Sequence, residues 1–545
     1  MSASEPVPLP GVRVRPKVNK WVVTVSVTFG TLMGAIDSSI VNVALPHIRG
    51  SLGATLQEIT WVTTGYALAL VLVMPLTAFL GRLFGQKRVY MICLALFVVG
   101  SALCGTAQSL PALVAWRALQ GFGAGALQPT EQAILRQTFP VEEQGMAMAL
   151  FGMAVMLGPA VGPTLGGWIV DHSTWPWIFY INLPVGILGL VMVGTFVHED
   201  PELQAKNREL AEAQRKNIDG WGIGLMSLGL AALQYFLEEG ARDDWFESRV
   251  ITGCLLVAFF ALAAFVLREL TAKVPAVDLR LFKDPVFLSG TVIGALMFTM
   301  LLANMFLLPV FMQELLGFSA TQSGFALMPR VLAMMVAVPI IGRIYNAVSP
   351  RLVIAAGVLL FSVGAWQMSH FTLQSGQREI VLPMIIQGLG FACLFVPLTT
   401  VALSKVPRHK LADATGLNSL LRQIGGSIGL AVFVTLLSNY AVAARQGLVA
   451  HVYASSPTVQ QRLASITAGL QARGLDPLSA QQGAVAAIYG MVAKQSMVLA
   501  FDKLFILCGG LFLLVLPLLY FLKAPQRAAG PARGSAHRPE VHLEA

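Results

Sequence analysis

An acid, Asp37, lies inside the first long apolar stretch of the chain. If this stretch crosses a bilayer, a charge near its centre costs at least about 2.5–3.5 kcal/mol, so the residue should face a packed interior or a water-filled cavity. Gly30 and Gly34 precede it on the same helical face, which suits close helix packing. Two roles stay open for Asp37. It exchanges a proton or pairs with a cationic substrate, or it is a structural acid bonded to neighbours such as Ser38 or Asn42.

A second polar stripe runs through the apolar segment 110–134. Its members recur at helical spacing on one face and are Arg117, Gly121, Ala124, Gln128 and Glu131. Arg117 and Glu131 stand about 21 Å apart at 1.5 Å per residue, which is too far for an ion pair. Arg117 is therefore expected to act on a carboxylate of another helix, with Asp37 as a candidate, or to donate to backbone carbonyls. Glu131 is either a second proton or cation site or a solvated acid near the cytoplasmic mouth.

The segment 145–170 carries a series of glycines and prolines: Gly158, Pro159, Gly162, Pro163, Gly166 and Gly167. Glycines four residues apart form a small-residue ridge that permits close helix contact. The prolines remove backbone donors and bend a helix. This combination favours a surface that moves during a conformational change over static packing.

Two basic residues and a set of methionines mark the second half of the chain. Arg330 and Arg422 lie in apolar segments, where a cation either serves function or extends its head group to the interface or to carbonyls. The methionines are Met297, Met300, Met305, Met312, Met328, Met334 and Met335. Flexible thioethers suit a promiscuous wall, but lipid-facing filling is the favoured interpretation.

These residues belong to a chain of 545 residues, of which 56% are hydrophobic and 12% charged. Soluble domains carry about 25% charged residues, so this chain could not cover itself with polar surface in water. A membrane helix needs about 20 mainly apolar residues, and fourteen such segments occur. They lie near residues 21–44, 58–80, 88–107, 110–134, 145–170, 177–197, 219–237, 249–268, 286–312, 321–344, 351–370, 380–403, 414–438 and 497–522.

The fourteen spans predict the topology and the domain organisation. An even number places both termini on one side, and connections rich in Lys and Arg, such as that with Lys87 and Arg88, mark this side as cytoplasmic. The sequence Gln120-Gly121 recurs as Gln387-Gly388, which predicts two six-helix halves. The predicted parts are a cytoplasmic segment 1–20, a first half 21–197, a cytoplasmic linker 198–218, two additional helices 219–268, a second half 269–522 with a long external loop 439–496, and a disordered cytoplasmic tail 523–545.

Several other functions lack the residues that they need. The chain contains no G-x-x-x-x-G-K-[ST] phosphate loop, so no ATP motor is expected. The five cysteines form no C-x-x-C pair and the eight histidines no metal-binding motif, so no disulfide framework, metal site or cofactor is predicted. The G-x-S-x-G match at 425–429 lies in a membrane segment with no preceding strand, so no enzyme is predicted. The net charge of +9 fits basic cytoplasmic loops, and nucleic acid is not an expected partner.

The motifs resemble one family over about residues 20–522. They are Asp37 through Pro46, Trp61 and Tyr66 in the second span, Arg117, Gln120, Gly121 and Gly123 in the fourth, the glycine-proline series of the fifth, Trp177 through Pro184, Asp244 through Phe246, and Gly416 through Gly426. Together they resemble the major facilitator superfamily, and within it the fourteen-span drug/proton antiporters of the EmrB/QacA type. Ala78 and Arg82 stand where the family's loop motif has Gly and Asp, and Asn346 replaces the Asp of the second copy, which argues against a charge-relay gate there.

The resemblance implies an all-α integral membrane protein with the major facilitator fold, which exports hydrophobic or amphipathic drugs across a bacterial inner membrane in exchange for protons. The residues expected to couple protons or bind substrate are Asp37, Arg117, Glu131, Asn42, Gln128, Trp61 and Tyr66. Those expected to serve conformational change are Gly121, Gly158, Pro159, Gly162, Pro163, Gly166, Gly167, Lys87, Arg88 and Arg422.

The expected partners are a small-molecule substrate, protons and the lipid bilayer. Members of the resembled family with a long loop before the last span often work with a periplasmic adaptor and an outer-membrane channel, so the resemblance implies these partners here. Three alternatives stay open. An importer is disfavoured by the glycine-proline series of the fifth span, and the direction of accumulation in oriented vesicles would identify it. A dedicated exporter of one metabolite, fatty acid or antibiotic would share every motif, and a non-transporting receptor or scaffold would move no protons in response to a substrate.

Overall fold

A computed structural model describes residues 19–140, 143–199, 219–272, 275–344, 348–453 and 455–522. The helices of the first predicted half are α1 Lys20–Leu52, α2 Leu56–Ile59, α3 Trp61–Val73, α4 Thr77–Phe84, α5 Gln86–Gly105, α6 Leu110–Thr138, α7 Gln144–His172, α8 Trp177–Tyr180 and α9 Asn182–Phe196. The later helices are α11 Gly220–Glu239, α12 Arg249–Thr271, α13 Pro285–Val310, α14 Ala320–Ile344, α15 Pro350–Met368, α16 Gln377–Val401, α17 Leu411–Val449, α18 Pro457–Gln471 and α19 Pro477–Leu513.

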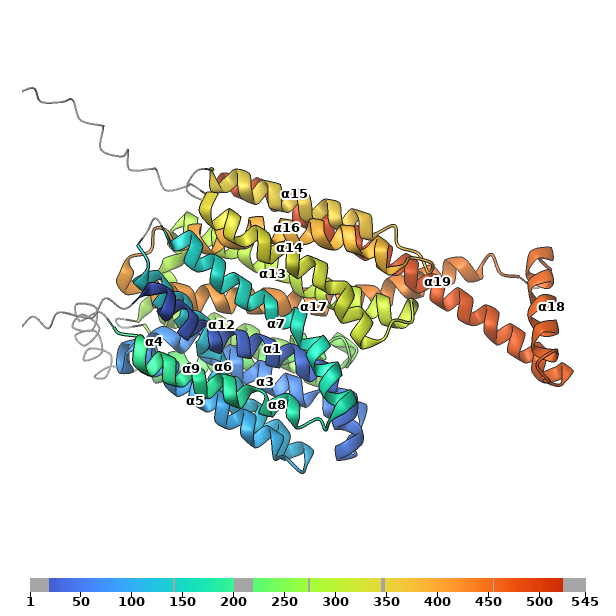
Figure 1. Ribbon diagram of the computed structural model, residues 1–545, viewed down its shortest axis with the longest axis horizontal. Coiled ribbons are helices and arrows are strands. Elements are labelled where there is room, and N and C mark those ends of the chain that lie inside the picture. The colour runs from blue at the N-terminus through green and yellow to red at the C-terminus, as the bar shows by residue number, and fades with distance from the viewer. Residues whose placement is uncertain are drawn as a thin grey trace, which may run out of the picture.

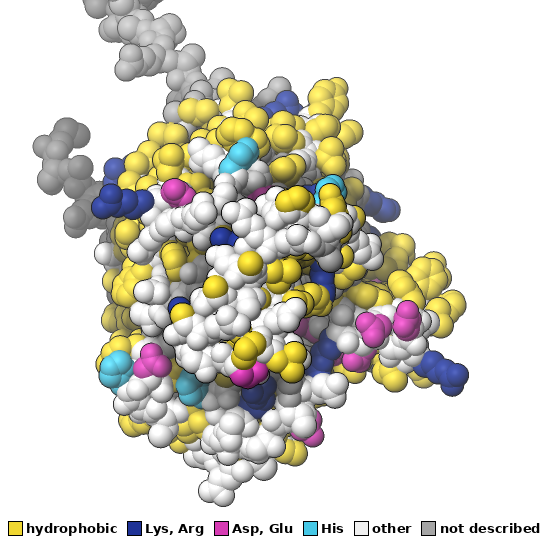
Figure 2. Space-filling model, turned by 90° about the vertical axis from the view of Figure 1, so that its right-hand side faces the viewer, with side chains coloured by type: hydrophobic (Ala, Val, Ile, Leu, Met, Phe, Trp, Pro, Cys, Tyr) yellow, Lys and Arg dark blue, Asp and Glu magenta, His cyan; other side chains and the backbone are white. Residues whose placement is uncertain are grey.

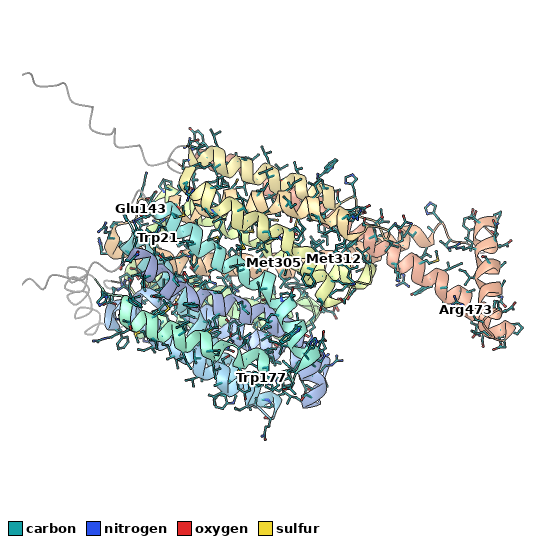
Figure 3. The ribbon with its side chains drawn as sticks, in the orientation of Figure 1. Trp21, Glu143, Trp177, Met305, Met312 and Arg473 are labelled. Carbon is teal, nitrogen blue, oxygen red and sulfur yellow. The ribbon has the colours of Figure 1, made fainter. Side chains whose placement is uncertain are left out.

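The long helices run side by side in one bundle (Figure 1). We call the end at which α1 begins and α19 finishes the terminal end. We call the opposite end, from which α17 and α19 project, the loop end. Figure 2 shows the loop end, where hydrophobic side chains gather around the rim. Exposed Trp21 and Trp177 lie near opposite ends of the bundle (Figure 3), as aromatic residues do at the two membrane interfaces.

Each of the fourteen predicted spans is helical, the second being divided among α2, α3 and α4 and the sixth between α8 and α9, although only thirteen described segments are long and apolar enough by composition to cross a membrane. The segment that falls short is α6. It carries Arg117, Glu131 and Arg136, and it packs in the bundle against α3 and α5. Because its charged side chains are buried among protein rather than exposed to lipid, a polar helix is tolerated there.

The two additional helices lie at the junction of the predicted halves. Helix α11 packs against α3 of the first half and against α17 of the second. Tyr235 of α11 stacks near Trp61 with ring centroids 5.6 Å apart, and Gln234 donates to the Ser427 hydroxyl at 3.0 Å. Helix α12 packs on α11, few of its side chains are buried, and its exposed apolar residues include Leu256, Phe259, Phe260 and Leu267, as lipid contact requires.

The predicted external loop 439–496 is largely helical. Helix α17 continues to Val449 and α19 begins at Pro477, so both helices extend beyond the predicted ends of their spans. The Ala/Gln-rich composition favours helix and allows this continuation into water. Residues 439–496, which we call the arm, project from the bundle and carry α18 at the tip (Figure 1). The Arg445 guanidinium lies 4.3 Å from the Tyr489 ring centroid and links the two long helices.

The methionine prediction is wrong for most of its residues. Met297, Met300, Met312 and Met334 are buried, and of the seven only Met335 is exposed. Met305 and Met312 lie on α13 and the turn that follows it, within the bundle (Figure 3). These side chains therefore fill the protein interior, because α13 is surrounded by α14, α16, α17 and α19.

The glycine ridge of α7 packs against α1 of the same half. A Cβ atom at Gly158 would overlap Ala35, one at Gly162 would overlap the Ser39 hydroxyl, and one at Gly166 would meet Ile40. The ridge is therefore a close contact between α1 and α7 within the first half. Its role in conformational change stays a prediction. The α7 face toward the second half instead carries Gly167, which lies near Thr321 of α14.

Replacement of Gly158 by alanine is expected to destabilise the protein, because the new methyl group would overlap the backbone of Ala35. Overpacking of this kind costs about 1–3 kcal/mol. Gly34→Ala is the matched control, since nothing lies within 4 Å of its added Cβ and alanine is the better helix former. We expect the Tm of the purified protein to fall for Gly158→Ala only. An unchanged Tm for that variant would contradict the close contact between α1 and α7.

Candidate functional site

The Asp37 carboxylate is completely buried, and both of its oxygens accept hydrogen bonds. Oδ2 accepts from Nη1 of Arg117 at 2.6 Å. Oδ1 accepts from Nε2 of Gln120 at 2.9 Å and from Nδ2 of Asn182 at 3.0 Å. Helices α1, α6 and α9 therefore meet at one carboxylate, and the Arg117 partner predicted from the sequence is the one observed.

Arg117 is held as firmly as the acid. Its Nε donates to the Val62 carbonyl at 3.1 Å, its Nη1 also donates to Oε1 of Gln120 at 2.7 Å, and its guanidinium carbon lies 4.2 Å from the Tyr66 ring centroid. The side chain is 1% exposed. A buried ion pair repays its desolvation only when further hydrogen bonds satisfy both partners, and this site meets that condition.

Ser101 of α5 completes the network. Its hydroxyl accepts from Gln120 at 3.2 Å and from Asn182 at 3.0 Å, and it donates to the Phe179 carbonyl at 2.9 Å. The predicted site did not include Ser101, Gln120 or Asn182. The family motifs contain Gln120 and Asn182 and could have identified them, whereas Ser101 stands in an ordinary apolar pattern with no signal of its own.

The predicted Asn42 and Trp61 do not join this network. Asn42 donates to the Ser38 carbonyl at 3.2 Å on its own helix, and both residues are exposed. Gly34, one turn before Ser38, faces open space. Exposed amide and hydroxyl groups are more favourable beside water than beside lipid, so this face of α1 is better suited to water than to the hydrocarbon of a bilayer. Trp61 points instead to Tyr235 of α11.

Glu131 lies in a second polar pocket, nearer the terminal end. It is completely buried, and Oε1 accepts from the Thr28 hydroxyl at 3.0 Å. Its other oxygen has no hydrogen-bond partner within the described ranges, and no cationic side chain forms an ion pair with it there. Gln128, one turn earlier on α6, is half-buried. The sequence alternative of a solvated acid at the mouth is therefore wrong for this conformation.

Charged side chains join the two halves at the terminal end. Arg82 of α4 donates to Asp413 of α17 at 2.6 Å, and Arg136 of α6 donates to the Thr399 and Thr400 carbonyls at 2.7 and 2.8 Å. The sequence argued against a charged gate here because Arg82 replaces an acid. The structure corrects this expectation, since the acid is supplied by the other half.

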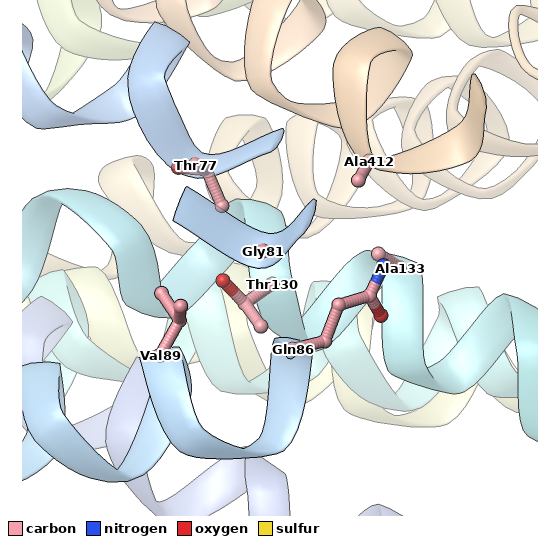
Figure 4. Close-up of a pocket in the computed structure, with 7 residues that line it drawn as sticks. All are labelled: Thr77, Gly81, Gln86, Val89, Thr130, Ala133 and Ala412. Atoms are coloured by element: carbon pink, nitrogen blue, oxygen red, sulfur yellow. The ribbon is translucent and has the colours of Figure 1, made fainter. Parts of the chain in front are cut away.

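The predicted Lys87 and Arg88 do not take part in this junction. Lys87 donates to the Gly194 carbonyl of α9 at 2.7 Å, within the first half, and Arg88 is exposed. Asn346 lies outside the described residues. A small cavity beside the junction is lined by Thr77, Gly81, Gln86, Val89, Thr130, Ala133 and Ala412 (Figure 4). Its walls lack packing partners on one side, so closure depends strongly on the polar contacts.

Loss of Arg117 alone should destabilise the fold more than loss of the whole pair. Arg117→Met leaves a buried carboxylate without its cation, at a cost of about 3–5 kcal/mol. The double variant Asp37→Asn/Arg117→Met removes both charges, so its Tm should lie above that of Arg117→Met. A thermal denaturation cycle that includes Asp37→Asn measures the coupling. Additive effects of the two changes would contradict a coupled pair.

Comparisons with known proteins agree with this architecture. The Major Facilitator Superfamily pattern matches residues 27–430. The multidrug export protein EmrB of Haemophilus influenzae is 33% identical over 506 residues, which cover 92% of this chain and 96% of that protein. The fatty acid resistance protein FarB of Neisseria gonorrhoeae is 33% identical over 515 residues, which cover 94% and 97%.

Solved structures show the same fold at much lower sequence identity. The crystal structure of the human organic anion transporter MFSD10 (TETRAN) superimposes with a TM-score of 0.59 at 15% identity, over 93% of this chain and all of that one. With the sequence match across most of its length and this arrangement of helices, the chain belongs to the Major Facilitator Superfamily and is a multi-pass membrane protein.

Proposed function

We propose that this protein is a proton-coupled antiporter that exports hydrophobic or amphipathic drugs and related small molecules across a bacterial inner membrane. Its near full-length similarity to multidrug export proteins supports the direction and the substrate class. The buried Glu131 carboxylate, which has no cationic partner in the part of the chain described, is the observation that carries proton coupling.

The two acids have different roles in this proposal. Asp37 is neutralised by Arg117 and held by two amides, so it anchors α1, α6 and α9 as a fixed anion. An ionised carboxylate without a counter-charge is unfavourable in a low-dielectric interior, so Glu131 stays buried when it holds a proton and must meet water or a cation to release it. Glu131 is thus the proton carrier and Asp37 the organising charge, the reverse of the order that the sequence suggested.

Alternating access links this proton to substrate. The contacts of Arg82 and Arg136 close the terminal end, while Ser38 and Asn42 are exposed toward the loop end. With both termini in the cytoplasm, as the distribution of Lys and Arg predicts, this is an outward-facing state in which the buried Glu131 holds its proton until the bundle rearranges. Each charge that crosses 100 mV supplies about 2.3 kcal/mol for the return step.

The arm is the docking surface for a periplasmic adaptor in this proposal. It projects past the bundle (Figure 1), and apolar side chains lie exposed on one face of the projecting part of α19: Leu478, Val485 and Tyr489. Their spacing of seven and four residues places them in one stripe. An exposed apolar stripe outside the membrane indicates a protein partner, and a helical one suits its shape.

A dedicated exporter of one fatty acid or other metabolite is the second candidate. The chain is as similar to FarB as it is to EmrB, at 33% identity over nearly its whole length, so this similarity supports a dedicated exporter as much as a multidrug exporter. Transport of a panel of cationic, neutral and acidic compounds into inverted vesicles distinguishes the two. Uptake of one chemical class alone would favour the dedicated exporter.

Glu131→Gln should abolish proton release upon substrate addition to purified protein, because glutamine cannot hold an exchangeable proton at this site. Asp37→Asn should still release a proton if it folds, since the carrier is retained. Release is measured as a pH change in weakly buffered solution with ethidium as substrate. Asp171→Asn, which alters an exposed acid at the end of α7, is the control and should release a proton as wild type does.

Unchanged release in Glu131→Gln would contradict its role as the carrier. Loss of release in Asp37→Asn with ethidium still bound would return the assignment to Asp37. Absence of release from wild type despite verified binding would argue against exchange at a shared carboxylate.

The double variant Leu478→Asp/Val485→Asp should lose drug resistance in cells and keep transport in inverted vesicles, because only the partner surface changes. Capture of the adaptor by the purified variant should fall at least about tenfold. Ala486→Asp places a charge on an exposed neighbouring position away from the stripe and should bind as wild type. Equal adaptor capture by all three proteins would exclude this stripe as the docking surface.

A further inference from the structure

Two arginines are buried in the middle of the second half without an acid beside them. Arg330 of α14 is 2% exposed and Arg422 of α17 is 4% exposed. Six ion pairs occur among the described residues, and neither arginine takes part in one. Arg330 donates to the Asn304 side chain at 3.4 Å, and Arg422 donates to the Ser419 hydroxyl at 3.3 Å. These neutral contacts leave both positive charges uncompensated.

The sequence offered two structural explanations for these arginines, extension of the head group to the membrane interface and donation to backbone carbonyls, and neither fits these positions. A side chain that reaches an interface would be exposed at its tip, and both are buried. Their hydrogen bonds in the described structure go to side chains rather than to carbonyls, and Nε of Arg422 has no partner there. The Arg422 guanidinium lies 5.5 Å from the Phe298 ring centroid, which provides only partial compensation.

The internal repeat shows what the second half has lost. Gly121 packs on the Tyr66 carbonyl, and Gly388 packs in the same way on the Arg330 carbonyl, so Arg330 occupies the place of Tyr66. Asn304 stands 83 residues before Gln387, as Asp37 stands 83 residues before Gln120. The neutral Asn304 therefore takes the place of the anchoring carboxylate.

The charge balance of the two halves consequently differs. In the first half the guanidinium of Arg117 and the carboxylate of Asp37 neutralise each other. In the second half the Arg330 guanidinium lies beside the Asn304 amide of α13, and the Arg422 guanidinium lies near Phe298 of the same helix. Asn304 and Phe298, which contact Arg330 and Arg422, lie six residues apart on α13, about 9 Å along its axis and about 120° apart around it, so the two guanidinium groups lie at separate positions on this helix.

The surroundings suit an apolar group next to an anion. Leu327 and Met334, one turn before and after Arg330, belong to one buried hydrophobic cluster with Met297 and Met300 of α13. Methionine side chains adapt to ligands of different shape. An arginine binds a carboxylate through two parallel hydrogen bonds, and such a pair is strong in a low-dielectric interior.

We infer that Arg330 forms a subsite for the carboxylate of an amphipathic organic acid, whose apolar part lies against the methionine-lined wall of α13 and α14, and that the more distant Arg422 adds positive charge to this region. Both guanidinium groups are covered in this conformation, so the acid enters when the halves part. The inference rests on the proposed transport function for its substrate class, but binding to the site is testable without transport or proton coupling.

The test compares two ligands that differ only in charge. Dansyl-undecanoic acid and its carboxamide are titrated into the full-length protein in lipid nanodiscs, with empty nanodiscs subtracted, and dansyl fluorescence reports binding. We expect wild type to bind the acid at least about tenfold more tightly than the amide. Arg330→Gln should remove this preference, Arg330→Lys should retain part of it, and Arg422→Gln should reduce it. Arg473→Gln removes an exposed arginine from the arm (Figure 3) and should behave as wild type.

A second measurement separates a binding role from a structural one. If Arg330 stabilises the fold, Arg330→Met should lower Tm. If Arg330 is an unpaired charge in the ligand-free protein, its removal should leave Tm unchanged or raise it. Equal affinities of wild type for the acid and the amide would overturn the inference, as would a preference that survives in Arg330→Gln. Ethidium-induced proton release in the same nanodiscs tests the proposed antiport separately, so either idea can fail alone.

Discussion

The buried ion pair between Asp37 and Arg117 is the interaction on which the first half of the molecule depends. Lipid offers no hydrogen bonds, so every charge placed at mid-membrane must find its partners within the protein. Here a carboxylate from α1 accepts from α6 and α9, and the arginine reaches back to α3. One satisfied network thus sets the rotation of four helices relative to one another, and it leaves Ser38 and Asn42 exposed on another face of α1.

The two halves repeat the fold without repeating this chemistry. The same glycine contact brings together the second and fourth helices of each half, so the backbone arrangement is conserved between the copies. The polar groups differ, because Asn304 and Arg330 replace Asp37 and Tyr66 at the corresponding places. The first half thus contains the neutralised pair of Asp37 and Arg117 and the acid Glu131, which forms no ion pair among the described residues. The second half contains Arg330 and Arg422, which form none there either. If the proposed proton carrier and the inferred anion subsite both hold, protons and organic anions are accommodated by different halves.

The terminal end illustrates how an ion pair can be preserved with its charges exchanged. Arg82 stands where an acid was expected, yet Asp413 of the other half lies within hydrogen-bond distance. Arg136 adds contacts to two carbonyls that face it from α16. Electrostatic attraction between the halves requires opposite charges and a short distance, not a particular assignment of the charges. Closure of this end thus agrees with the expected fold although one local motif departs from the family.

The sequence by itself determined the fold class, the fourteen helical spans and the two residues at the centre of the site, Asp37 and Arg117. It could do so because hydropathy, helical spacing and intramembrane charge are local properties. It could propose Arg117 for Asp37 from the polar stripe alone. Only the tertiary structure decided that Ser101 and Asn182 complete the network and that Trp61 contacts Tyr235 of α11. It also decided that the glycine ridge packs on α1 and that Arg82 pairs with Asp413. These outcomes depend on the rotation and register of helices far apart in the chain, which no local pattern specifies.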